Sequence, residues 1–149
     1  LHVRLKHAYI IRCDSFIKDE KENITEIKCT YFPASKSGSD KSGIKAKGVI
    51  HWVADGTAIP VEVRLYDRLF QVENPAAEEG DFKNYLNPQS LEVIPKALAE
   101  PFLKDTKPGD KYQFLRKGYF CVDTDSTPEK IIFNRTVPLK DGWSKEQKK

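Results

Sequence analysis

The chain has 149 residues, which is long enough for one ordinary domain or two small barrels with a core of their own. Its 25 lysines and arginines against 22 acids give a formal net charge of +3, well short of the excess in a non-specific nucleic-acid coat. It has no run of about 18 apolar residues and no charged-then-apolar leader, so we expect a soluble protein without a membrane partner.

The first third of the chain predicts strands joined by polar connections. Residues 1–6 alternate as a strand, the alternation changes phase around Ala8 and Tyr9 as at a bulge, and residues 24–31 form another strand after a polar hairpin connection at 19–23. Residues 33–45 are small, polar and rich in lysine, which is typical of a flexible loop. Because the strand pattern starts at the first residue, we expect the chain to be a fragment.

Residues 47–75 are the stretch around which the rest can be placed. Apolar side chains fall on both faces of residues 49–53, and Val61, Val63 and Leu65 alternate with polar neighbours as in an antiparallel strand with one wet face. The turn at Asp55 and Gly56 between these runs predicts a hairpin.

The remaining elements are also short. We expect a helical turn at 82–86, a strand at 90–99 with Pro95 at an edge or bulge, a strand at 110–123 interrupted by Gly118, and a strand at 130–137 before a solvated tail at 144–149. No segment shows an amphipathic helix of a dozen residues, so the pattern favours all-β barrels or a sandwich.

The three cysteines are Cys13, Cys29 and Cys121. An odd number without a CxxC spacing or a nearby histidine pair argues against a zinc site and a disulfide framework. We expect reduced thiols that lie on strands and are buried in the core.

Several words of the sequence together resemble the C-terminal anticodon-binding region of the bacterial type of the glutaminyl-tRNA synthetase family. They are GVIHWV, VRLYDRLF, VENP, LNPQSL, QFLRKGYFCVD and FNRTV, and they span nearly the whole chain. The resemblance implies two antiparallel barrels similar to ribosomal protein L25, a far barrel at roughly residues 1–100 and near-barrel strands at roughly 101–143. The near barrel would lack strands that precede Leu1 in the family.

An enzymatic reaction within this chain is not expected. His2, His7 and His51 have no catalytic motif around them, and neither a glycine-rich phosphate loop nor a metal-ligand cluster is present. The resemblance implies that a catalytic domain of the same polypeptide joins glutamine to tRNA(Gln) with ATP and Mg²⁺ during translation, in a cytoplasmic monomer. For the chain itself no cofactor and no metal are expected.

RNA binding is the stronger interpretation, because single-stranded RNA is read by planar side chains and a few fixed donors. Arg4 and Lys6 share one face of a strand, and Gln113 and Arg116 lie in or beside a late strand. In the family the three anticodon bases occupy separate pockets. The resemblance implies that Arg4 lines the pocket of the first base, that Gln113 hydrogen-bonds the middle uracil, and that Arg116 contacts phosphate or base nearby.

Two departures from the family pattern affect this site. Leu115 stands where an acid is common, and Lys6 replaces an arginine. The alternatives are a glutamyl-tRNA synthetase of the archaeal and eukaryotic type, which shares these barrels, and a non-catalytic RNA-binding barrel similar to ribosomal protein L25.

Arg64, Tyr66 and Arg68 also suggest an RNA surface, but the order Tyr-Asp-Arg at the end of a strand is typical of a hydrogen-bonded corner. We therefore assign these residues to the stability of the fold.

Overall fold

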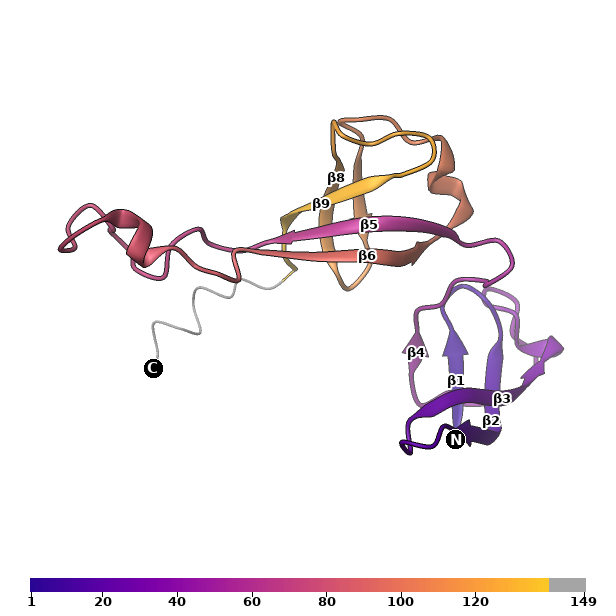
Figure 1. Cartoon of the computed structure of the whole chain (residues 1–149). Coiled ribbons are helices and arrows are strands. Elements are labelled where there is room, and N and C mark those ends of the chain that lie inside the picture. Colours follow the sequence, from indigo (N-terminus) through magenta and orange to yellow (C-terminus); the bar gives the residue numbers. More distant parts are fainter. Residues whose placement is uncertain (140–149) are drawn as a thin grey trace. The chain divides into compact units, whose positions relative to one another are not determined.

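The computed structural model describes residues 1–139. Within them every element of regular secondary structure is a β-strand or a short 3-10 helix. The all-β class is therefore confirmed. The chain divides into two compact units, Leu1–Trp52 (unit 1) and the part from Val53 onward (unit 2), each with its own sheet. The two sheets are seen in Figure 1.

Unit 1 contains a four-stranded sheet in the order β3-β2-β1-β4. Its strands are β1 (His2–Leu5), β2 (Ile10–Lys18), β3 (Ile24–Phe32) and β4 (Val49–Ile50). The hairpin between β2 and β3 is confirmed. The predicted bulge is wrong, because His7 has a φ of 59° and the Ala8 amide donates to the Leu5 carbonyl at 2.9 Å, which closes a tight turn between β1 and β2.

Unit 2 contains a five-stranded sheet in the order β6-β5-β9-β8-β7. Its strands are β5 (Ile59–Tyr66), β6 (Leu91–Ala99), β7 (Lys111–Phe114), β8 (Gly118–Val122) and β9 (Ile132–Val137). The turn η3 (Pro101–Asp105) places buried Leu103 against the sheet. Val61 and Val63 of β5, Phe120 and Val122 of β8, and Phe133 of β9 form most of the core, which confirms the apolar face predicted for β5.

The hairpin predicted between residues 49–53 and 61–66 is wrong. β4 pairs in parallel with β1 in unit 1, whereas β5 pairs with β6 and β9 in unit 2. Each run has the alternation of a strand, but alternation does not specify a partner. The apolar side chains on both faces of residues 49–53 also predict two faces that are at least half buried, and this is wrong because Val49, Ile50 and Trp52 are exposed in this structure.

β5 and β6 continue beyond the sheet as a paired arm that contains η2 (Phe82–Tyr85), the expected helical turn (Figure 1). Phe70 and Leu86 form an isolated bridge across this arm. β6 lies at the edge of its sheet, and the register with β5 shifts between the pairs Val61–Ala97 and Val63–Ile94. Pro95 falls within that shift, so the predicted edge position and bulge are confirmed.

Within residues 1–139 neither sheet closes into a barrel, which agrees with an incomplete barrel, and two of the strand pairs are parallel. Strands on both sides of position 100 share the sheet of unit 2, because β5 pairs with β6 before that position and with β9 after it. The two units divide after Trp52, whereas the far and near barrels are expected to meet near residue 100, and that division stays a prediction. The predicted tail at 144–149 lies outside the described residues.

The cysteines are free among the described residues, but their predicted burial is wrong for two of them. Cys13 and Cys29 lie opposite each other on β2 and β3 and are exposed, and Cys121 on β8 is half-buried. Desolvation raises the pKa of the Cys29 thiol, with a smaller contribution from Cys13. Most residues of β2 and β3 are exposed, and Cys13 and Cys29 are among them.

Candidate nucleic-acid interface

The hairpin of β7 and β8 contains both Gln113 and Arg116. Gln113 is an exposed residue of β7, and its neighbours Tyr112 and Phe114 pack against the core from the other face of the strand. Arg116 lies in the turn with a φ of 64°, and the Lys117 amide donates to the Phe114 carbonyl at 2.8 Å. The alternation of β7 thus presents the Gln113 amide to solvent on a strand that the core holds in place.

Tyr119 is a residue that the sequence analysis missed. It pairs directly with Gln113 across the hairpin, and 46% of its surface is exposed. Residues directly opposite each other on antiparallel strands project from the same face of the sheet. An exposed phenol ring therefore lies beside an exposed amide, a combination that can stack a base and hydrogen-bond its edge. The available signal was its position in the same QFLRKGYF word.

Gly118 lets this hairpin turn tightly. Its φ is 142°, and a Cβ at this position would lie 2.6 Å from the Val137 carbonyl oxygen of β9. Only glycine accommodates both the conformation and the close approach. The interruption predicted within residues 110–123 is thus a turn between two strands.

In unit 1 the Arg4 guanidinium is held by three acceptors. Nη1 donates to the Ser35 carbonyl at 2.6 Å and to the Ala8 carbonyl at 3.2 Å, and Nη2 forms an ion pair with Asp40. The Arg4 side chain is 19% exposed. Hydrogen bonds to the Ser42 hydroxyl and amide, and then the contact with Arg4, hold the pKa of Asp40 below its usual value. Such bonds fix the edge of the guanidinium, while its two faces are the surfaces on which a base stacks.

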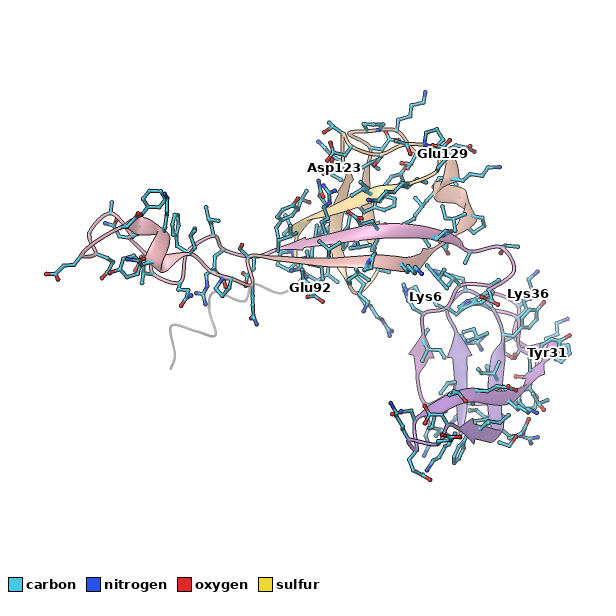
Figure 2. The ribbon with its side chains drawn as sticks, in the orientation of Figure 1. Lys6, Tyr31, Lys36, Glu92, Asp123 and Glu129 are labelled. Carbon is cyan, nitrogen blue, oxygen red and sulfur yellow. The ribbon has the colours of Figure 1, made fainter. Side chains whose placement is uncertain are left out.

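Lys6 follows β1 directly, and its side chain has no ion pair among residues 1–139. Its amide donates to the Ile50 carbonyl at 2.9 Å, and its carbonyl accepts a hydrogen bond from Trp52 Nε1 at 3.0 Å. Lys6, which is labelled in Figure 2, is thus fixed at its backbone and is half-buried as a residue. Arg4 and Lys6 lie in unit 1, and Gln113 and Arg116 lie in unit 2, so the structure places the four predicted residues in two pairs.

Arg64 belongs to an ion-pair network on the sheet of unit 2. Its guanidinium lies 2.8 Å from Glu62, 3.2 Å from Asp123 and 3.5 Å from Asp125, and Lys130 binds Glu62 at 2.8 Å. The hydrogen bond to Glu62 is the main cause that raises the pKa of Arg64. Hydrogen bonds from Lys130 and then Arg64 lower that of Glu62. These partners come from β5 and the loop after β8, so the network joins distant parts of the chain.

The backbone of Arg68 is held in the arm, since the Asp67 carboxylate accepts from the Arg68 amide at 2.8 Å and Asn87 Nδ2 donates to the Arg68 carbonyl at 3.0 Å. These contacts form a hydrogen-bonded corner after β5, of the kind that the sequence predicts.

The described residues contain neither a metal-ligand cluster nor a membrane-spanning helix. Among residues 1–139 no group of three or more histidine, cysteine, aspartate or glutamate side chains could hold a metal ion. Asp123 and Asp125 instead face Arg64. No helix within the described residues is both long and apolar enough to span a bilayer.

Comparison with known proteins adds to this geometry. Residues 49–123 match the family described as "tRNA synthetases class I (E and Q), anti-codon binding domain". The chain is 52% identical over 149 residues to a glutamine–tRNA ligase of Rhodopirellula baltica, a match that covers 99% of the chain and 25% of the relative.

Two further relatives are also named glutamine–tRNA ligase. The identity is 52% over 146 residues with the protein of Proteus mirabilis (98% of the chain, 26% of the relative) and 53% over 144 residues with that of Escherichia coli K12 (96% and 26%). The chain thus spans about a quarter of the length of these relatives.

Proposed function

The chain belongs to the anticodon-binding domain family of the class I tRNA synthetases for glutamate and glutamine, and on that premise we propose that it recognises the anticodon loop of tRNA(Gln). The three relatives named above, which are about half-identical in sequence, are named for glutamine, and this favours glutamine over glutamate. The observation that carries the proposal is the exposed pair of Gln113 and Tyr119 on a hairpin fixed by the core.

The middle base of the glutamine anticodons is a uracil, whose edge carries both a donor and an acceptor. The amide of Gln113 offers an acceptor oxygen and two donor hydrogens, so it can satisfy both positions at once. Tyr119 supplies the stacking surface next to it, and Arg116 in the turn supplies positive charge for the base or its phosphate. In unit 1 the held plane of Arg4 lines the pocket of the first base, and Lys6 provides charge beside it.

The chain spans about a quarter of the length of its relatives, and our proposal extends to the rest of the intact protein. We propose that a catalytic domain in the same polypeptide ligates glutamine to tRNA(Gln) with ATP and Mg²⁺ in the cytoplasm, and that the protein works as a monomer. This chain then supplies recognition only.

The test measures binding of the chain to anticodon stem-loops that carry CUG or UUG, and to the same loops with the middle uracil replaced. We expect Gln113→Ala to abolish the preference for uracil, since one good base contact is worth about 1–3 kcal/mol. Gln89→Ala is the matched control, because Gln89 is an exposed glutamine of the same unit on the arm. Equal preference for uracil in both variants would refute the role of Gln113.

A further inference from the structure

Charge is unevenly distributed within unit 1. The loop of residues 33–48, which we call the lysine loop, contains Lys36, Lys41, Lys45 and Lys47 and a single acid, Asp40. The hairpin of residues 14–26 contains five acids and two lysines. The whole chain is nearly neutral, but unit 1 contains a basic segment, the lysine loop, and an acidic segment, the hairpin of residues 14–26.

The four lysines of this loop are exposed, and none has an ion pair among residues 1–139. Two lysines of β2 and β3 differ, since Lys18 pairs with Glu22 and Lys28 lies 3.8 Å from Glu26. An ammonium group already bound to a carboxylate has to give up that partner to reach a phosphate. The lysine loop does not have this cost.

The loop is also fixed at several points of its backbone. The Ser37 amide donates to the Ala8 carbonyl at 2.9 Å, and the Lys47 amide donates to the His2 carbonyl at 2.9 Å. Ser35 is completely buried, accepts from the Ile10 amide at 2.7 Å and donates to the Phe32 carbonyl at 2.6 Å. A loop ordered before binding loses less conformational entropy when it meets its ligand.

Asp40, the one acid of the loop, is occupied by Arg4. Its carboxylate forms the ion pair with the Arg4 guanidinium and accepts hydrogen bonds from the Ser42 amide at 2.8 Å and the Ser42 hydroxyl at 2.7 Å. The ion pair neutralises the only negative charge that would oppose a phosphate here. It also joins the middle of the loop to β1.

We propose that the lysine loop is a contact surface for the sugar-phosphate backbone of RNA, and that Arg4 and Asp40 form a positioning pair that holds the loop in its binding conformation. This inference rests on the proposed function, and it adds a second kind of contact. The hairpin of unit 2 reads a base, while the loop of unit 1 binds phosphates without reading sequence. Figure 2 shows Lys36 and Lys6 toward the same end of unit 1, where the Ser37–Ala8 hydrogen bond joins the loop to the turn after β1.

The first test neutralises three loop lysines in the variant Lys36→Gln/Lys41→Gln/Lys45→Gln and measures binding to the stem-loops across a salt series. We expect affinity to fall about tenfold or more at low salt, equally for loops with and without the middle uracil. The slope of log K against log salt should lose about 0.7 for each phosphate contact removed from a single strand.

The matched control is Lys18→Gln/Lys21→Gln/Lys28→Gln, which removes the same formal charge from the other side of unit 1. An equal loss in both variants would mean that net charge alone acts, and that would overturn the proposal, as would unchanged binding of the loop variant. If the unmodified chain binds without preference for uracil but the loop variant still weakens it, base reading fails while the loop contact stands. If the unmodified chain binds no stem-loop at all, both are rejected.

The second test concerns the positioning pair. Simple electrostatics and a positioning role predict opposite changes in RNA affinity for the variant Asp40→Asn. Asp40→Asn removes a negative charge, so simple electrostatics predicts tighter RNA binding. A positioning role predicts weaker binding, because the asparagine presents only one acceptor to Ser42 and Arg4 together. We expect at least a threefold loss of affinity, with the far-ultraviolet circular dichroism unchanged. Tighter binding of Asp40→Asn would overturn the positioning role.

Discussion

Replacing Gly118 by alanine should destabilise unit 2 and disturb the hairpin that presents Gln113. At a φ of 142° an alanine is strained, and its Cβ would lie 2.6 Å from the Val137 carbonyl oxygen and 3.5 Å from Pro138 Cα. A residue held in so sparsely populated a conformation costs roughly 1–3 kcal/mol. Displacing β9 from β8 to relieve the contact would weaken a backbone hydrogen bond, worth about 1 kcal/mol. The free energy of unfolding should therefore fall by about 2–4 kcal/mol.

Thermal and urea denaturation followed by circular dichroism measure this change. A domain of the size of unit 2 loses about 4–8 °C in Tm for each kcal/mol, so we expect a fall of at least about 8 °C. Two other glycines of the same unit serve as controls. Gly109 has a φ of 91° but open space around it, and Gly56 has neither a positive φ nor a close neighbour. The order of destabilisation should be Gly118→Ala, then Gly109→Ala, then Gly56→Ala. A Gly118→Ala protein as stable as Gly56→Ala would refute the reasoning.

Three further predictions concern the core and ion pairs of unit 2. Phe133→Ala should lower the free energy of unfolding by about 3–5 kcal/mol in urea titrations. Phe133 is fully buried, and the centroid of its ring lies 5.0 Å from that of Phe114. Arg64→Ala and Arg68→Ala should each lower Tm more than RNA affinity, and the reverse ranking in paired melting and binding assays would contradict a structural role. Stability should also fall in acid.

The sign of that pH dependence follows from the carboxylates. The Asp125 amide and the Asn134 side chain lower the pKa of Asp123, and Lys130 and Arg64 lower that of Glu62, from ordinary values of 3.8 and 4.5. Their contribution is complete above pH 4.5 and is lost as the pH falls through the lower folded-state pKa values. Urea titrations between pH 7 and 3 should show less pH dependence in Asp123→Asn, and an unchanged slope would argue against this cause.

The sequence predicted individual strands well and their partners poorly. Alternation locates β5, β6 and β9 closely because the side-chain period of a strand is local. Pairing is a property of the whole chain, so the adjacent runs at 49–50 and 59–66 look like a hairpin although they belong to different sheets. The sequence also named Gln113 and Arg116 but not Tyr119, whose importance depends on its place opposite Gln113.

The word Val-Arg-Leu occurs twice, at residues 3–5 and 63–65, and the structure gives its two arginines related surroundings. Both lie on strands with an antiparallel neighbour on one side and a parallel neighbour on the other. Both also bind acids far away in the sequence. The two copies of the word thus share their pattern of strand pairing and a distant acidic partner.

The two arginines differ in the number of carboxylates around them, and that number separates the roles that we propose for them. Arg64 and Lys130 are surrounded by Glu62, Asp123 and Asp125, so the network carries more negative than positive charge and repels phosphate. Arg4 lies on β1 and meets one carboxylate and two carbonyls, and the loop that supplies the carboxylate has only lysines as its other charged groups. On our proposal the same three residues thus stabilise a sheet in unit 2 and organise a basic surface in unit 1.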